Sequence, residues 1–244
     1  MISTIFPFRC ALCGIKIESL GLCSRCWTKT EFITAPLCAL CGDPLGYWGE
    51  NTLCNACAAL PNPFFRHRAV WKYGPGIKQL IFKFKHNHQI WLTEFFGYQM
   101  LRLLLEYYPE GRLLIPVPLH PKRLMQRGFN QALLLARWLS RRTGIPYDYS
   151  SLRRVKDTDS QGLKPAQERH SNVGQAFHYC PTFPLPINVI LVDDVYTTGA
   201  TLKACANALK AKGVHHIRGI TLSKVIPLGG FKNVNDMLEL DSPS

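Results

Sequence analysis

The sequence predicts an α/β fold, with a mainly parallel sheet and flanking helices, behind a small cysteine-rich module at residues 1–60. Three observations support this prediction. Eight of the ten cysteines fall within the first 57 residues. Beyond them, short apolar runs alternate with segments of helical periodicity, which is the pattern of strands joined by crossover helices. One run, Val189–Val192, is continuously apolar, as expected of a strand buried on both faces of a parallel sheet.

The cysteines of the first module form four Cys-x-x-Cys pairs. Each pair presents two sulfurs from one tight turn, and two pairs complete the tetrahedral shell of thiolates that binds zinc. Nine residues separate the first pair from the second, and twelve separate the third from the fourth, enough in each case for a short hairpin. The repeated sequence Cys-x-Leu-Cys-Gly favours two similar zinc ribbons built from consecutive pairs, while an interleaved arrangement remains the alternative. The predicted ligands of one or two structural Zn²⁺ ions are Cys10, Cys13, Cys23, Cys26, Cys38, Cys41, Cys54 and Cys57.

A disulfide framework is the competing interpretation of so many cysteines. The chain begins Met-Ile-Ser-Thr-Ile-Phe-Pro, which lacks the basic and apolar regions of a secretion signal. We therefore expect a cytoplasmic protein whose thiols stay reduced, and this favours zinc over disulfides.

Residues 61–230 are predicted to form one α/β domain, and residues 231–244 a flexible tail. The turn residues Gly74-Pro75-Gly76 end the first strand, and two prolines end the second. The predicted strands span residues 69–73, 113–118, 152–155, 189–192 and 217–222. The predicted helices span residues 77–84, 91–108, 131–142 and 202–211, the last of them rich in alanine and lysine.

The longest apolar stretch, at residues 90–108, is interrupted by Glu94, Arg102 and Glu106. Its apolar residues recur at the spacing of an amphipathic helix that packs one face on a core. A membrane-spanning helix needs about 20 consecutive, mostly apolar residues. We therefore expect no membrane insertion.

The residues after the apolar run at 189–192 combine two carboxylates with a phosphate-binding turn. Asp193 and Asp194 lie at the expected carboxyl end of the strand, where open α/β sheets bind their ligands. The turn then enters a helix, whose first N–H groups and dipole attract a phosphate group. Two carboxylates can accept hydrogen bonds from the two hydroxyls of a ribose, and a Mg²⁺ ion can bridge them to the sugar. The order of these groups therefore predicts a ribose 5-phosphate across the strand end. The residues of the turn are Thr197, Thr198, Gly199, Ala200 and Thr201.

This stretch resembles the phosphoribosyl-pyrophosphate (PRPP) signature of type I phosphoribosyltransferases, which is four apolar residues, two acids, a two-residue spacer and Thr-Thr-Gly-Ala-Thr. Further motifs resemble the ComF family of competence proteins, also called GntX-like, in which a double zinc ribbon precedes a phosphoribosyltransferase domain. The resemblance extends over nearly the whole chain, to about Val225. Its motifs are Phe-Lys-Phe-Lys-His at 82–86, Val-Pro-Leu-His-Pro at 117–121, Arg-Gly-Phe-Asn-Gln at 127–131, and Arg154, Gln161, Leu163, Glu168, Arg169 and Asn172.

The resemblance implies a type I phosphoribosyltransferase-like fold that binds PRPP together with Mg²⁺. The 5-phosphate would lie in the turn at 197–201, and the ribose diol on the expected catalytic residues Asp193 and Asp194. The pyrophosphate would lie between Pro116 and Arg127.

Three residues are expected to complete the PRPP site. Val117 belongs to the pyrophosphate segment, and the Arg127 guanidinium can donate paired hydrogen bonds to phosphate oxygens. The alternative for Arg127 is a structural role before a helix that Asn130 caps. Lys83 is the expected lysine ligand. Lys83 and Lys85 lie on different faces of one helix, so at most one of them reaches a shared ligand.

The formal net charge of +13 is unevenly distributed along the chain. Residues 1–60 hold four Lys/Arg and four Asp/Glu, whereas residues 120–170 hold eleven Lys/Arg and four Asp/Glu. Such a basic segment attracts either nucleic acid or a phosphorylated substrate.

Two functions therefore stay open. The first is a protein of DNA uptake and utilisation (natural competence) that transfers phosphoribosyl from PRPP to an unknown acceptor. The second is a non-catalytic module that senses PRPP or binds single-stranded DNA, and that partners a DNA-uptake helicase or processing protein.

Overall fold

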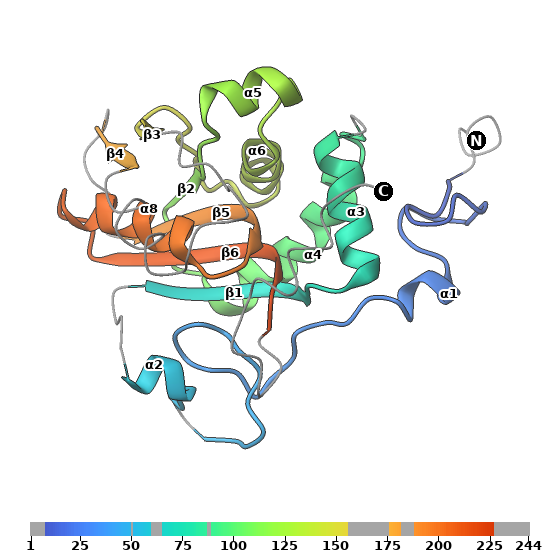
Figure 1. Cartoon of the computed structure of the whole chain (residues 1–244), viewed down its shortest axis with the longest axis horizontal. Coiled ribbons are helices and arrows are strands. Elements are labelled where there is room, and N and C mark those ends of the chain that lie inside the picture. Colours follow the sequence, from blue (N-terminus) through green and yellow to red (C-terminus); the bar gives the residue numbers. More distant parts are fainter. Residues whose placement is uncertain are drawn as a thin grey trace, which may run out of the picture.

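The computed structural model describes residues 8–49, 51–59, 65–86, 89–155, 176–181 and 188–226. Its centre is a four-stranded parallel sheet with the order β1-β6-β5-β2 (Figure 1). These strands are β1 (Phe65–Lys72), β2 (Leu113–Pro116), β5 (Asn188–Tyr196) and β6 (His216–Lys224). A parallel sheet with helices on its faces is the architecture that the sequence predicts, and the structure confirms it.

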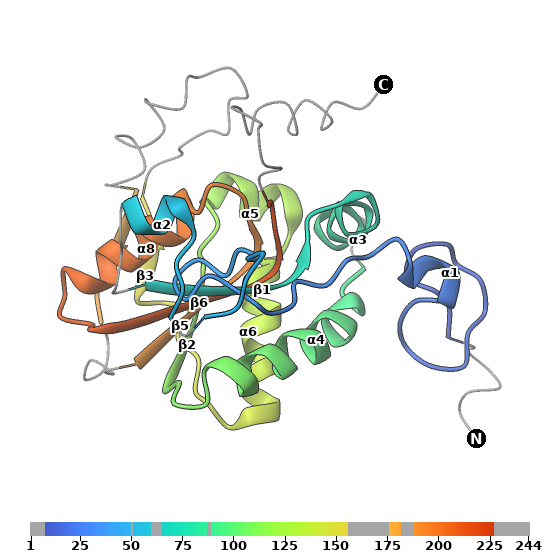
Figure 2. The same cartoon turned by 90° about the horizontal axis from the view of Figure 1, so that it is seen from below.

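Helices cover both faces of the sheet. Figure 2 shows α4 (Leu92–Tyr107) and α6 (Gln131–Thr143) on one side and α8 (Ala200–Lys210) on the other. The helix α3 (Pro75–His86) follows β1 directly, and α5 (Pro121–Arg127) follows β2. None of the helices in the described part of the chain is long and apolar enough to cross a membrane.

The core has two parts because consecutive side chains of a strand point to opposite faces. In β5, Ile190 and Val192 belong to the larger apolar cluster, which contains residues of α4 and α6. Val189 and Leu191 belong to the second cluster, which contains residues of α8. All four side chains are fully buried. This alternation is what a strand buried on both faces requires.

Several strands differ from the prediction in their bounds or pairing, and three of these differences matter most. The first strand starts at Phe65 instead of residue 69, because the alternating residues Phe65-Arg66-His67-Arg68 pair with β6 although two of them are charged. The predicted strand at 152–155 is β3 (Leu152–Arg154), which pairs antiparallel with β4 (Phe177–Tyr179) in a separate two-stranded sheet.

The third difference is in β5, which continues past residue 192 to Tyr196. Its polar residues keep pairing with β6, with Asp193 opposite Thr221 and Tyr196 opposite Lys224. The hydrophobic pattern ends at Val192, but the backbone ladder does not. The helix α5 was also not predicted, since its residues are largely polar and exposed. The motif residues between 156 and 175 and the predicted tail lie outside the described residues.

The segment between the two cysteine-rich regions runs along the outer edge of the sheet. Ile33 N donates to Val70 O (2.9 Å), and Lys72 N donates to Glu31 O (2.8 Å). Phe32 forms an antiparallel bridge with Trp71 of β1. The chain therefore covers the edge of β1 with its own backbone, which protects an otherwise open strand.

Candidate PRPP site and zinc centres

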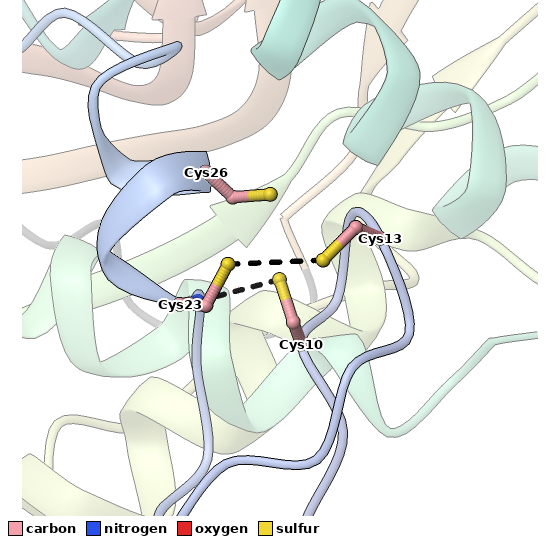
Figure 3. Close-up of side chains that lie close together, drawn as sticks. All are labelled: Cys10, Cys13, Cys23 and Cys26. Atoms are coloured by element: carbon pink, nitrogen blue, oxygen red, sulfur yellow. Dashed lines mark hydrogen bonds between the residues drawn. The ribbon is translucent and has the colours of Figure 1, made fainter.

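The first cysteine cluster brings together Cys10, Cys13, Cys23 and Cys26, whose sulfur atoms all lie within 4.8 Å of one another (Figure 3). Cys13 Sγ and Cys23 Sγ are 3.7 Å apart, and Cys23 N donates to Cys10 Sγ over 3.3 Å. Burial opposes ionisation of Cys10, but backbone N–H groups of Cys13, Cys23 and Leu12 outweigh it and lower the pKa of Cys10 to about 6. Thiolates stabilised by turn N–H groups are suitable zinc ligands.

The second cluster has the same composition. The sulfur atoms of Cys38, Cys41, Cys54 and Cys57 also lie within 4.8 Å of one another. Burial opposes ionisation of Cys38, but the backbone N–H groups of Cys54, Cys41 and Leu40 lower its pKa to about 7. Pairing is therefore consecutive, as favoured from the sequence, and the interleaved alternative is wrong. The two clusters are the Cys₄ sites of a double zinc ribbon, and their donor sets fit structural Zn²⁺.

The two ribbons lie at different places on the α/β unit. Figure 1 shows the first ribbon, with α1 (Ser24–Trp27), beside α3, and the second, with α2 (Asn55–Ala59), below β1. Lys83 of α3 holds the first ribbon, because its Nζ donates to Ala11 O (3.0 Å) and Leu12 O (2.7 Å). The structure thus places Lys83, the expected phosphate ligand, on the first zinc knuckle.

Lys85, two residues later, points to the acid pair instead. Its Nζ lies 3.1 Å from Asp194 Oδ2, and both side chains are largely buried. Lys83 and Lys85 therefore reach different partners, as their spacing requires.

Asp193 and Asp194 lie beyond the end of the neighbouring strand. β2 ends at Pro116 opposite Val192, and Val117 N donates to Val192 O over 2.9 Å. Beyond this point the strand pairs of β5, within the described part of the chain, are those with β6. Because both acids belong to a strand, they alternate between its faces, and the backbone N–H of Asp194 donates to Asp193 Oδ1 (2.9 Å).

The acid pair is surrounded by cationic side chains. Burial, followed by the Asp194 carboxylate, raises the pKa of Asp193 to about 7, while Lys85 and Arg154 oppose the increase. Burial lowers the pKa of Arg127, and the charges of Asp194 and Asp193 act against this. The Arg127 guanidinium thus lies in the electrostatic field of both carboxylates. At the carboxyl end of β5, Lys85 thus pairs with Asp194, and Arg127 lies in the field of both acids.

The turn at 197–201 connects β5 to α8. Thr197 and Thr198 are exposed, and Gly199 is buried with a φ of +74°, in the left-handed region that favours glycine. Ala200 N lies 3.3 Å from Thr198 Oγ1, and Lys203 N donates to Gly199 O over 2.8 Å. Ala200 and Thr201 belong to the first turn of α8. The N-terminus of α8 therefore follows directly on the exposed residues Thr197 and Thr198, close in sequence to the acid pair.

The segment before α6 has the cap that the sequence predicts. Asn130 caps α6, because its Oδ1 accepts from Ala132 N (2.9 Å) and Leu133 N (3.4 Å). Its Nδ2 donates to Val117 O (3.0 Å), which ties the cap to the end of β2. Val117 itself is buried, and its backbone N and O are hydrogen-bonded to Val192 O and Asn130 Nδ2. Asn130 therefore provides the cap, and Arg127 Nη1 lies 3.5 Å from Gln131 Oε1 in the first turn of α6.

The comparisons with known proteins agree with this organisation. Residues 1–58 match the family model of the double zinc ribbon domain. The chain is 33% identical over 227 residues to competence protein F of Haemophilus influenzae, covering 87% of this chain and 95% of that protein. The chain belongs to the competence protein F family.

Other members of the competence protein F family are similar over comparable lengths. DNA utilization protein YhgH of Escherichia coli (strain K12) is 30% identical over 217 residues, which covers 85% of this chain and 92% of that protein. Competence protein ComFC of Bacillus subtilis is 30% identical over 199 residues, 79% of each chain. Among solved structures, a purine phosphoribosyltransferase from Pyrococcus horikoshii is 22% identical, with a TM-score of 0.36 over 55% of this chain and 73% of that one.

Sequence reasoning missed several residues of this family member's site region. Lys85 lies in the basic motif at 82–86, but the spacing alone did not say which of its two lysines faces the acids. Tyr196 and Lys224 lie at the ends of β5 and β6, and they connect the turn to the second ribbon. No local pattern marks either residue, since the contacts join segments far apart in the sequence.

Proposed function

We propose that this protein binds PRPP with Mg²⁺ at the carboxyl end of β5 and transfers its phosphoribosyl group to an acceptor, as part of DNA uptake and utilisation. The observation that supports this most directly is the convergence of two acids, Lys85 and Arg127 beside the threonine turn at 197–201. The names of the relatives, which refer to competence and DNA utilization, supply the biological setting.

Each part of PRPP has a chemically suited partner in this arrangement. The 5-phosphate would accept hydrogen bonds from the N-terminus of α8 and the hydroxyls of Thr197, Thr198 and Thr201. The ribose hydroxyls would donate to Asp193 and Asp194. Arg127 would bind the pyrophosphate near the backbone of Val117.

Lys85 takes the role that the sequence assigned to Lys83. In the free protein it neutralises Asp194. When the ribose hydroxyls bind Asp194, the ammonium group is available to the pyrophosphate, a short distance from the same carboxylate. Mg²⁺ would add charge neutralisation of the leaving pyrophosphate.

Transfer needs no covalent nucleophile from the protein. As the bond from the anomeric carbon to pyrophosphate breaks, positive charge develops on the sugar and negative charge on the leaving group. Carboxylates near the sugar and cations near the pyrophosphate stabilise both. The acceptor then attacks the anomeric carbon.

Calorimetry with PRPP and Mg²⁺ tests the binding site. We expect Asp194→Asn and Lys85→Met each to weaken PRPP binding by about tenfold or more, the usual effect of removing a charged hydrogen-bond partner. Lys83→Met is the matched control in the same helix, and it should leave PRPP affinity within about twofold. Equal effects of Lys83→Met and Lys85→Met would contradict this site. Pyrophosphate release in the presence of candidate nucleobases then tests transfer.

A second candidate function, binding of single-stranded DNA by a non-catalytic module, is favoured by exposed aromatic side chains in a basic protein. Trp48 in the second ribbon is 79% exposed. Arg142 stacks over the rings of Tyr98 and Trp138 at 5.3 and 5.1 Å. Bases would stack on such rings, and cationic side chains would neutralise the phosphates, so binding would have no sequence preference.

This second function predicts a steep decrease of DNA affinity with salt. Affinity for a labelled oligonucleotide would be measured between low and physiological salt, for the wild type and for Trp48→Ala. A flat salt dependence would argue against DNA binding. Binding without any PRPP-dependent release of pyrophosphate would favour the module, alone or with a DNA-uptake helicase or processing protein, over the enzyme.

A further inference from the structure

A buried chain of contacts joins the second zinc ribbon to the threonine turn. Its centre is Lys224, the last residue of β6, which is 3% exposed. Lys224 Nζ donates to Cys41 O over 2.7 Å and lies 2.8 Å from Asp43 Oδ1. The same ammonium group lies 4.8 Å from the centre of the Tyr196 ring. A buried ammonium must keep such partners, because an unpaired charge in the interior is costly.

His67 of β1 makes a second connection between the same elements. It is fully buried, with Nδ1 3.3 Å from Cys41 O and Nε2 3.0 Å from Thr221 Oγ1. Its ring stacks on Tyr196 with 4.2 Å between the ring centres. Cys41 O thus faces both His67 and Lys224, and both residues contact Tyr196.

Tyr196 in turn touches the phosphate turn. It is the last residue of β5, and its backbone O accepts from Val225 N over 2.9 Å. A Cβ atom added to Gly199 would overlap the phenol oxygen of Tyr196. The ring therefore packs directly against the backbone of the turn, at the residue whose positive φ shapes it. A displacement of the Tyr196 ring would change the path of the turn.

The knuckle at Cys38–Cys41 is held on the sheet by its backbone. His67 N donates to Leu40 O (2.7 Å), and Arg68 donates to Cys38 O (3.2 Å). A Cβ atom on Gly42 would lie 2.6 Å from His67 O. The knuckle is thus packed closely on β1. Metal binding that folds the knuckle therefore also fixes the positions of Cys41 O and Asp43 beside Lys224.

We propose that the second zinc ribbon positions the phosphate turn, with Lys224 and Tyr196 as positioning residues between Cys41 and Gly199. The inference rests on the proposed function of the turn. Zinc bound at the second site fixes the knuckle, the knuckle fixes Lys224 and Tyr196, and the Tyr196 ring fixes the backbone that receives the 5-phosphate. The zinc-loaded ribbon is thus part of the substrate site although none of its residues touches the ligand.

The test uses two ligands that occupy different parts of the site. Ribose 5-phosphate needs the turn at 197–201, whereas pyrophosphate with Mg²⁺ needs the cations near Arg127. We expect Lys224→Met and Asp43→Asn to weaken ribose 5-phosphate binding by about tenfold in calorimetry, since small displacements of a binding group have large effects. Both variants should bind pyrophosphate within about twofold of the wild type.

Matched controls come from exposed positions. Lys212→Met removes a lysine after α8, and Glu18→Gln removes an acid from the first ribbon; neither should change the affinity for either ligand. Zinc per chain and the unfolding temperature are measured for every variant. Asp43→Asn keeps all zinc ligands and the buried lysine, so it tests the connection even if Lys224→Met does not fold.

The outcomes separate the inference from the proposed function. Weaker binding of ribose 5-phosphate with unchanged zinc content and unchanged pyrophosphate binding supports the inference. Equal ribose 5-phosphate affinity in wild type and Asp43→Asn overturns it and leaves the PRPP site intact. Equal loss of both ligands also overturns it, because this indicates general damage. If the wild type binds neither ribose 5-phosphate nor PRPP, the proposed function fails and the inference fails with it.

Discussion

The two zinc ribbons share the sequence Cys-x-Leu-Cys-Gly but attach to the α/β unit by different forces. In the first ribbon, Ala11 and Leu12 are buried in the larger apolar cluster. The second ribbon is held mainly by buried polar groups, with Lys224 and Arg68 donating to knuckle carbonyls. The first ribbon therefore combines apolar burial with the two Lys83 hydrogen bonds, whereas the second is attached mainly by hydrogen bonds to its knuckle. Apolar docking is non-directional, whereas polar docking fixes positions precisely.

Among the changes that test this difference between the ribbons, loss of a zinc ligand should have the largest effect on zinc content and stability. Cys26→Ser and Cys54→Ser are each expected to reduce zinc from two ions to one per chain, because the clusters are formed by consecutive pairs. Since metal supplies much of the folding free energy of such modules, the unfolding temperature should fall by about 10 °C or more. Zinc analysis and calorimetric melting measure both. A variant that lost both ions would show that the two sites fold together and are not independent.

The glycines that follow each knuckle give a matched pair. Gly14 and Gly42 have φ values of +76° and +71°, so alanine is strained at both positions. Nothing lies within 4 Å of a Cβ atom on Gly14, but a Cβ atom on Gly42 meets His67 O. We expect Gly14→Ala to destabilise the protein by about 1 kcal/mol and Gly42→Ala by about 3 kcal/mol, because the backbone must also shift.

Urea unfolding of both glycine variants measures this difference. Equal destabilisation would mean that the second knuckle is not closely packed on β1, and the polar docking of the second ribbon would then need revision.

The leucines of the repeat should show the reverse order of destabilisation, with the larger loss of stability in the first ribbon. Leu12 is 7% exposed within the larger apolar cluster, whereas Leu40 is only partly buried. Leu12→Ala is expected to lower the free energy of unfolding by about 2–3 kcal/mol, and Leu40→Ala by less than about 1 kcal/mol. Both should keep two zinc ions. A larger cost at Leu40 would indicate that the second ribbon also depends on apolar contacts.

The comparison also shows which features the sequence could predict. The cysteine pairs and the motif at 189–201 are local patterns, so their residues and their order were readable. The end of β5 could not be predicted, because Asp193 and Asp194 break the apolar pattern while their backbone still pairs with β6. The docking of the ribbons was not predictable either. Cys41 and Lys224 are 183 residues apart, and a contact of this kind depends on the completed fold.

Lys83 and Lys85 illustrate the same limit at close range. Helical spacing correctly separates them onto two faces, but it does not say which face meets the acids. That depends on how α3 lies between the first ribbon and β5. One lysine holds the ribbon and the other pairs with Asp194, so a single helix connects the first zinc module to the candidate site.

The smallest expected effect contrasts the ionisable groups of the two regions. Backbone N–H groups favour the ionised form of Cys10, whereas burial, followed by the charge of Asp194, opposes ionisation of Asp193 and raises its pKa to about 7. An unfolded aspartate titrates near 3.9, so between about pH 4 and pH 7 the folded protein keeps a proton that the unfolded chain has released. The stability contributed by Asp193 is complete below about pH 4 and is lost as the pH rises through about 7.

Asp193→Asn removes this titration and serves as the reference. At pH 8 the variant should unfold a few degrees above the wild type, because the wild type then holds a partly buried charge. As the pH falls from 8 to 5 the difference should shrink, because the folded Asp193 carboxyl takes up its proton. Melting curves of both proteins from pH 5 to pH 8, with zinc content constant, measure the difference. A constant offset across this range would mean that Lys85 and Arg154 already stabilise the ionised carboxylate, and that the acid pair is ready for ribose hydroxyls without giving up a proton.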